Sequence, residues 1–153
     1  MHRIDELSGI VVDEAIRLHR EIGPGLLESV YEVVLAGRLE KRGLAVSRQV
    51  AVPLIIDDHC FDAAFRIDIL VEGSLILEIK AVETLSKAHA KQLLTYLRLF
   101  KQPVGLLLNF SEALMKDGIR RVVNDYRPDE ISAVSASSAT LREPILLYQG
   151  ETE

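Results

Sequence analysis

The chain has 153 residues, of which 48% are hydrophobic and 27% charged, and these proportions are typical of one soluble globular domain rather than a disordered chain. No apolar run is long enough to span a membrane, and the first residues lack the pattern of a signal peptide. We therefore expect a cytoplasmic protein with no membrane partner. The single cysteine, Cys60, excludes an internal disulfide and fits a reducing compartment.

The net charge of −5 is unevenly distributed along the chain. Between Arg38 and Arg121 there are 13 Lys and Arg residues against 10 Asp and Glu, whereas the two ends together carry 5 against 13. The acidic balance thus belongs to the termini. The mildly basic middle is compatible with a polyanion such as nucleic acid, although a mixed solvated surface explains any single lysine equally well.

The first third of the chain predicts two helices. Apolar residues recur at helical spacing from Ile4 to about Ile22, and again from Leu26 to about Arg42. Gly23-Pro24-Gly25 forms a tight elbow between them, and Gly43 ends the second helix.

Three antiparallel strands are expected next. Residues 46–56 alternate between apolar and polar, as in a strand with one buried face, and Pro53 makes this strand either an edge strand or a bulged one. Two apolar, β-branched runs, residues 60–71 and 75–82, flank Glu72-Gly73-Ser74, which is the pattern of a β-hairpin.

The rest of the domain predicts a crossover and a last helix. A helix from about Lys87 to Phe100, capped by Thr84 or Ser86, precedes the continuous apolar run of residues 104–108. Such a run is typical of a strand buried on both faces in a parallel pairing, so strand, helix and strand indicate a right-handed crossover. Ser111 is expected to cap a final helix with the apolar residues Leu114, Met115, Ile119, Val122, Val123 and Tyr126.

From Pro128 the composition changes to a linker of small residues before Ile145-Leu146-Leu147-Tyr148. We predict a domain over residues 1–127 and a mobile tail over residues 128–153, whose last apolar patch docks elsewhere. The fold class is α/β, with a mixed sheet of about four strands flanked by helices, two of them N-terminal.

The central hairpin carries four charged residues on one face. If residues 72–74 are the loop, Asp68 lies opposite Glu78, and Arg66 lies opposite Lys80. Opposed Cβ atoms are roughly 4.5–5.5 Å apart, where like charges destabilise. The two carboxylates therefore need a cation, which is either Lys80 or a divalent metal. The alternative is a structural network of both carboxylates with Arg66 and Lys80.

Three motifs resemble those of one enzyme superfamily. Asp68, nine intervening residues and Glu78-Ile79-Lys80 resemble the Asp…(Asp/Glu)-x-Lys signature of the PD-(D/E)XK nuclease superfamily. Gln92-Leu93-Leu94-Thr95-Tyr96 is similar to the Gln-xxx-Tyr motif of its exonuclease branch. Gly25-Leu26-Leu27-Glu28-Ser29-Val30-Tyr31 matches the motif that names the GxxExxY family within it. The resemblance extends from the first helix through Phe110.

The resemblance implies a restriction-endonuclease-like core and a Mg²⁺- or Mn²⁺-dependent nuclease that hydrolyses phosphodiester bonds in DNA or RNA, with DNA favoured. Asp68 and Glu78 are then metal ligands, Glu28 completes the metal site, and Lys80 orients the attacking water or stabilises developing charge. These assignments are chemically consistent, because Mg²⁺ prefers oxygen ligands and takes only one or two carboxylates in typical sites.

The helix of residues 87–100 is expected to bind the substrate through Gln92, Tyr96, His89, Lys87 and Lys91. Gln92 and Tyr96, four residues apart, also fit a plain side-chain pair on one helix face.

Several motif residues have purely structural alternatives. Glu28 lies where a carboxylate stabilises the start of a helix, Tyr31 fits a core residue with a hydrogen-bonded hydroxyl, and His19 fits a packed side chain. The alternative function is a non-catalytic module that binds nucleic acid or protein, since a fold alone does not establish activity. With either function, the short domain also favours a homo-oligomer or a protein partner.

Overall fold

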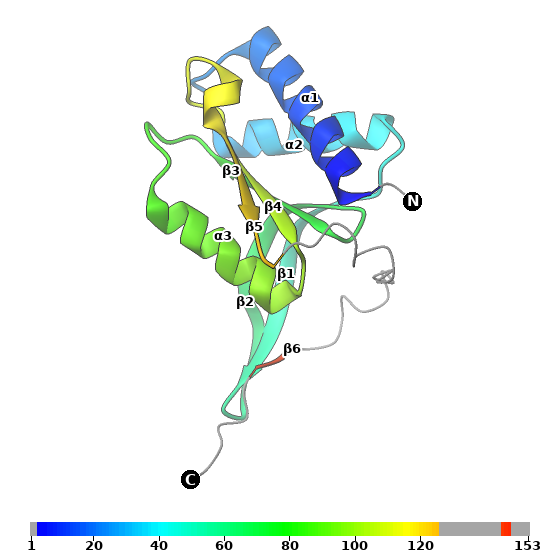
Figure 1. Ribbon diagram of the computed structural model, residues 1–153, viewed down its shortest axis with the longest axis vertical. Coiled ribbons are helices and arrows are strands. Elements are labelled where there is room, and N and C mark those ends of the chain that lie inside the picture. Colours follow the sequence, from blue (N-terminus) through cyan, green and yellow to red (C-terminus); the bar gives the residue numbers. More distant parts are fainter. Residues whose placement is uncertain (1–2, 126–144, 148–153) are drawn as a thin grey trace.

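The computed structural model describes residues 3–125 and 145–147 (Figure 1). The elements in chain order are α1 (Ile4–Ile22), α2 (Glu28–Lys41), β1 (Val46–Ile56), β2 (His59–Val71), β3 (Leu75–Lys80), α3 (Lys87–Phe100), β4 (Val104–Asn109), the 3-10 turn η1 (Met115–Gly118), β5 (Ile119–Val123) and β6 (Ile145–Leu147). The strands form one mixed sheet in the order β5-β4-β3-β2-β1-β6. The α/β class predicted from the sequence is confirmed, with two short strands beyond the four expected.

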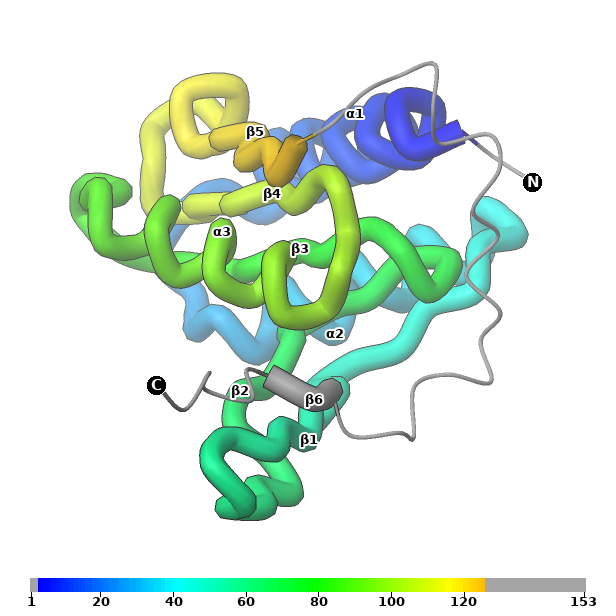
Figure 2. Tube along the Cα trace, turned by 60° about the horizontal axis from the view of Figure 1, so that its bottom comes forward, coloured from blue at the N-terminus to red at the C-terminus, as the bar shows by residue number. Residues whose placement is uncertain are grey.

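Helices cover both faces of the sheet. Figure 2 shows α3 in front of β3 and β4, with α1 and α2 behind them. One core cluster joins α1, α2 and η1 to the sheet, and the other joins α3 to the opposite face. β3 and β4 contribute buried residues to both clusters, so these central strands are apolar almost throughout.

The two N-terminal helices form as the apolar spacing predicted. The side chains of Leu7, Val11 and Leu18 on α1 are 1% exposed or less. α2 begins two residues later than expected and ends where Gly43 adopts a φ of 85°, donating its backbone N–H to Glu40. That left-handed backbone favours glycine, and it terminates the helix.

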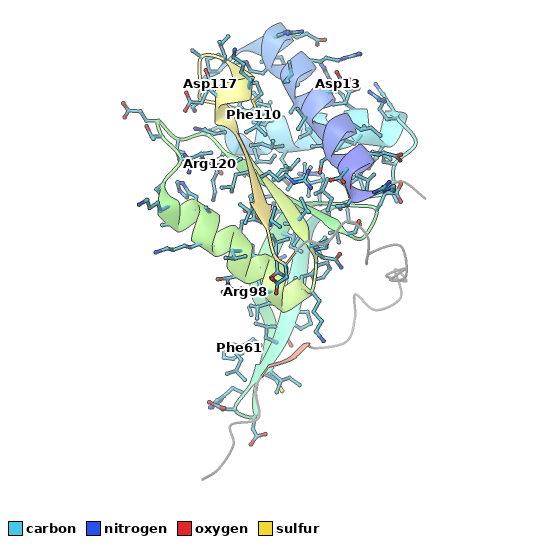
Figure 3. All side chains as sticks on the ribbon, viewed as in Figure 1. Asp13, Phe61, Arg98, Phe110, Asp117 and Arg120 are labelled. Atoms are coloured by element: carbon cyan, nitrogen blue, oxygen red, sulfur yellow. The ribbon has the colours of Figure 1, made fainter. Side chains whose placement is uncertain are left out.

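β1 and β2 form a long arm that extends beyond the rest of the sheet (Figure 1). The register shifts between Val52 and Leu54, so Pro53 marks a bulge, as predicted. Phe61 lies on the arm and is 47% exposed (Figure 3). β6, in the predicted tail, pairs in parallel with the end of β1, so part of the expected apolar patch docks on the sheet. The rest of that tail, and its boundary with the domain, lie outside the described residues.

The strand, helix and strand of the crossover are also confirmed. α3 begins after Ser86, whose hydroxyl accepts a hydrogen bond from the backbone N–H of His89. β4 then pairs in parallel with β3, from the pair Ile76–Gly105 to the pair Lys80–Asn109.

The final helix predicted after Ser111 is wrong. The described chain instead forms η1 and then β5, which pairs antiparallel with β4. A Cβ on Gly118 would collide with the backbone oxygen of Asn109, so the chain passes close to the end of β4 before turning along it. Ile119, Val122 and Val123 are β-branched and favour a strand, and β5 pairs with the edge of β4 that would otherwise be free.

None of the helices in the described ranges combines the length and apolar character that crossing a membrane requires.

Candidate active site

Glu78 and Lys80 lie at the carboxyl end of β3, two residues apart and therefore on the same side of the strand. Glu78 is 4% exposed, whereas Lys80 is half-buried. The parallel ladder with β4 continues through the pairs Glu78–Leu107 and Lys80–Asn109. The backbone that carries both side chains is therefore held in the centre of the sheet.

Asp68 lies at a gap between two ladders. The β1–β2 register has no pair at Gln49 and Asp68, although it continues on both sides, and the β2–β3 ladder ends at the pair Ile69–Leu77. The Oδ2 atom of Asp68 accepts a hydrogen bond of 2.9 Å from the backbone N–H of Ile79. The side-chain carboxylate thus takes the place of a backbone acceptor where the strands separate.

This geometry corrects part of the predicted hairpin. The register is as predicted for three pairs, from Val71–Leu75 to Ile69–Leu77. The ladder does not extend to the expected facing pairs of Asp68 with Glu78 and of Arg66 with Lys80, because the strands diverge there.

The two carboxylates are nevertheless electrostatic neighbours. Burial, and then the charge of Asp68, raise the pKa of Glu78 from 4.5 to about 8, against the opposing effect of Lys80. The Oε1 atom of Glu78 is buried and has no hydrogen-bond partner among the described residues. Burial also raises the pKa of Asp68, while the hydrogen bond from Ile79 lowers it. Burial is the largest cause of both shifts, and the neighbouring negative charges add to it.

Glu28 reaches the same end of β3 from α2, of which it is the first residue. Its Oε1 atom accepts a hydrogen bond of 3.0 Å from the backbone N–H of Ala81. The preceding elbow is braced by Tyr31, whose hydroxyl donates to the carbonyl oxygen of Gly23 at 2.6 Å and accepts from the backbone N–H of Leu26 at 3.2 Å. The start of α2 is therefore held against the end of the hairpin.

Two residues that the sequence did not single out complete the surroundings of Asp68. Glu32, one turn after Glu28, is 5% exposed and pairs with Arg48 at 3.3 Å. Both of its carboxylate oxygens accept from the side-chain amide of Gln49 at 3.0 Å, and the same amide nitrogen lies 3.5 Å from Oδ1 of Asp68. Glu28 and Glu32 are four residues apart on α2, and this helical spacing could have predicted that Glu32 lies near the site. No pattern in the sequence indicated Gln49.

Gln49 also has a strained backbone. Its φ is 50°, a left-handed value that is uncommon for a residue other than glycine, and it occurs inside β1 where the ladder has its gap. Such conformations persist only where the surroundings hold them, and they cluster at functional sites.

On α3, Tyr96 is the expected substrate-binding residue that the structure brings to the carboxylates. Its ring stacks on Phe65 with the centroids 4.3 Å apart. Burial, followed by the charges of Glu78 and Asp68, raises the pKa of its hydroxyl.

The other expected α3 residues lie farther along the helix surface. Gln92, Lys87 and Lys91 are exposed. The Nδ1 atom of His89 accepts from the backbone N–H of Ser86 at 3.0 Å, so this ring also helps to cap the helix. None of these four has a hydrogen bond to the site carboxylates among the interactions of the described residues.

His19 and Tyr31 are packed, as their structural alternatives predicted. His19 is 6% exposed, and its Nε2 atom lies 2.8 Å from the backbone oxygen of Glu112. The ring of Tyr31 stacks on that of Phe110, with the centroids 4.4 Å apart; Phe110 is labelled in Figure 3.

The carboxylates of the site offer a small set of oxygen donors for a metal ion. Within residues 3–125, no group of three His, Cys, Asp or Glu side chains is close enough to hold one. Two carboxylates suffice for Mg²⁺, however, because this ion keeps several of its waters. Asp68 and Glu78 are such a pair, and the buried, unpartnered Oε1 of Glu78 lacks a positive partner. The residues present therefore fit a hard divalent cation.

A mixed sheet with helices on both faces, and with acidic residues gathered where two strands diverge, defines a restriction-endonuclease-like core. The family model of the PD-(D/E)XK nuclease superfamily matches residues 5–122, and the chain belongs to this superfamily. Neither the search of curated proteins nor that of solved structures found a match.

Proposed function

We propose that the chain is a metal-dependent nuclease of the GxxExxY family, which hydrolyses phosphodiester bonds with Mg²⁺ or Mn²⁺ and acts on DNA rather than RNA. The observation that carries the proposal is the buried Oε1 of Glu78, which has no partner and lies beside the charge of Asp68. A carboxyl in this position is costly to ionise unless a cation neutralises it, and without one it stays protonated at neutral pH.

Asp68 and Glu78 are the proposed metal ligands. Glu28 reaches the same end of β3 from α2, but its carboxylate is not close enough to theirs to form a group of three ligands among the described residues. A bound divalent ion lowers the pKa of its water and neutralises charge on the phosphate. Lys80 lies on the same side of β3 as Glu78 and opposes the raised pKa of that carboxyl, so its ammonium is close enough to act on the site. Its proposed role is to orient the attacking water or to stabilise developing charge.

The backbone supports this arrangement. The N–H groups of Ile79 and Ala81 hold the carboxylates of Asp68 and Glu28, respectively. In each of these carboxylates, only one of the two oxygens accepts a backbone hydrogen bond, Oδ2 in Asp68 and Oε1 in Glu28. Orientation by fixed donors reduces the rearrangement needed when a substrate binds.

The substrate is proposed to lie along α3. Tyr96 borders the carboxylates, Gln92 lies one turn before it, and His89 extends the same side of the helix by spacing. Lys87 and Lys91 are exposed in the first turns, where their charges attract phosphates.

The test is a cleavage assay on single-stranded, duplex and branched DNA and on RNA, with Mg²⁺, with Mn²⁺ or with EDTA. Lys80→Met should abolish cutting while the fold and nucleic-acid binding are kept. Lys116→Met is the matched control, because Lys116 is exposed on η1. If Lys80→Met cuts as fast as the parent, the catalytic assignment is wrong. If the parent binds nucleic acid without cutting it under any condition, the chain is the non-catalytic binding module instead.

A further inference from the structure

β1 and β2 exchange the sides of their apolar residues at one point. On β2, Ile67 packs in the core cluster of α3, whereas Ile69 packs in the cluster of α1 and α2. On β1, Val50 packs against the cluster of α3 and Val46 against that of α1 and α2. Residues separated by an even number of positions share one side of a regular strand, so both strands turn over between these residues.

The turnover leaves the direction of the Asp68 carboxylate to two hydrogen-bond donors. The β1–β2 ladder has no pair at Gln49 and Asp68, which lie within the turnover. The backbone N–H of Ile79 donates to Oδ2 of Asp68, and the Nε2 atom of Gln49 lies 3.5 Å from Oδ1. This second distance is longer than the usual value of roughly 2.9–3.0 Å, so the amide directs Oδ1 without occupying it fully. A carboxylate oxygen has a further lone pair, which stays available to an ion.

The amide of Gln49 is itself held by Glu32, a buried carboxylate that the proposed chemistry does not use. Both carboxylate oxygens of Glu32 lie 3.0 Å from Nε2 of Gln49, and Oε1 also lies 3.3 Å from Nε of Arg48. An amide nitrogen carries two hydrogens. The Glu32 carboxylate engages one of them, and the other is left for Asp68. Ionised carboxylates only accept hydrogen bonds, so the nitrogen of the amide, and not its oxygen, faces both groups.

Neither exposure nor backbone conformation explains a glutamine at position 49. Gln49 is exposed, so water could satisfy Glu32 in its place. Its φ of 50° would be less strained with glycine. Water has no fixed direction, whereas an amide anchored by a buried carboxylate does. The feature that glutamine adds here is a donor of fixed direction beside Asp68.

We propose that Gln49 is a positioning residue: anchored by Glu32, its amide fixes the Asp68 carboxylate in the orientation in which it binds a divalent cation. The inference rests on the proposed function, because it takes Asp68 as a metal ligand. Groups that hydrogen-bond to metal ligands orient those ligands, and their loss typically costs about 10–100-fold in metal affinity. Gln49 is neutral, so its replacement by another neutral residue tests orientation and not net charge.

The first test is the Mn²⁺ affinity of the complete chain without nucleic acid, measured from the electron paramagnetic resonance signal of the free ion. Gln49→Met keeps nearly the length of glutamine without the amide, and it should weaken Mn²⁺ binding about tenfold or more. Gln49→Gly suits the left-handed backbone and should weaken binding similarly, so it decides the result if the methionine variant does not fold. Gln102→Met is the matched control, because Gln102 precedes β4 and the site lies at the other end of that strand. It should bind Mn²⁺ as the parent does.

The outcomes separate this inference from the proposed function. If Asp68→Asn weakens Mn²⁺ binding and both Gln49 variants bind as the parent does, the inference is overturned and the proposed metal site stands. Tighter binding by the Gln49 variants would also overturn it, because the amide would then compete with the ion for Asp68. A parent that binds no Mn²⁺ would overturn the inference and the proposed function together.

The second test asks whether Glu32 acts through the amide. Glu32→Gln removes a negative charge as well as the anchor, so its effect on Mn²⁺ affinity is measured both in the parent and in Gln49→Met. Only the effect of charge remains in the second background. The loss of affinity should therefore be several-fold larger in the parent. Equal losses in the two backgrounds would show that Glu32 acts through its charge alone, and would overturn its anchoring role.

The third test is cleavage at increasing Mn²⁺ concentration. Gln49→Met should recover most of the parent's rate when the ion is raised to match its weaker affinity, because positioning acts through the binding of the ion. Lys80→Met should not recover at any concentration. If the defect of Gln49→Met appears instead as a raised KM for nucleic acid at saturating Mn²⁺, Gln49 contacts the substrate and the positioning role is overturned.

Discussion

Glu78→Gln should stabilise the metal-free protein at neutral and alkaline pH. The parent must keep Glu78 protonated in the folded state up to about pH 8, whereas in the unfolded state the group ionises near pH 4.5. Between these values the folded state binds more protons than the unfolded state, so the free energy of unfolding of the parent falls as pH rises. Its stabilisation by the neutral carboxyl is complete below pH 4.5 and is lost above about pH 8.

The size of the effect follows from the two pKa values. A tenfold change in proton affinity is worth about 1.4 kcal/mol, so the interval from 4.5 to about 8 corresponds to roughly 4–5 kcal/mol. The glutamine side chain has nearly the shape of the neutral carboxyl and does not ionise. The Glu78→Gln variant should therefore match the parent near pH 4.5 and exceed its stability by several kcal/mol near pH 8.

The assay is urea unfolding in EDTA, followed by far-ultraviolet circular dichroism because the chain has no tryptophan. Glu83→Gln is the control, since this glutamate is exposed close to the site. The control should follow the parent at every pH. Parallel curves for the parent and Glu78→Gln, or a parent that gains stability from pH 4.5 to pH 8, would refute the reasoning.

Three further outcomes are expected. In thermal melts, Asp68→Asn should leave the metal-free protein at least as stable as the parent. Mg²⁺ at about ten times its dissociation constant should stabilise the parent alone, by about 1.4 kcal/mol. If the variant instead loses roughly 3–5 kcal/mol and Mg²⁺ has no effect on the parent, Asp68 belongs to a structural ion pair. Replacing Lys87 and Lys91 together by Gln should flatten the salt dependence of nucleic-acid affinity in a titration, because each phosphate contact releases counterions; an unchanged slope places binding elsewhere. Tyr31→Phe should lower the free energy of unfolding by about 1–3 kcal/mol in denaturant unfolding, since the carbonyl oxygen of Gly23 loses its donor. An unchanged free energy of unfolding would show that this hydrogen bond does not stabilise the fold.

The structure also suggests why the site tolerates buried acidic residues. Glu32 is satisfied by Arg48 and the Gln49 amide, so its burial does not leave it unpaired. Glu78 differs, because its Oε1 atom has no such partner. Substitution of Gln49 would therefore disturb both Glu32 and Asp68, which share its amide nitrogen.

Local patterns in the sequence were enough to predict most of the fold. Helical spacing identified α1, α2 and α3, and the break at residues 72–74 predicted the β2–β3 register, because a short loop determines which residues pair beside it. The charged residues at the end of this hairpin were also found, since side chains alternate along a strand.

Only the tertiary structure decided what depends on contacts between distant segments. Ile119, Val122 and Val123 fit both helical and strand spacing, and the free edge of β4 selected the strand. The divergence at Asp68 depends on Gln49 in β1 and on the N–H of Ile79 in β3, and no spacing within one segment predicts such a gap. The raised pKa of Glu78 has the same origin, because burial is a property of the packed sheet and helices and not of the residue itself.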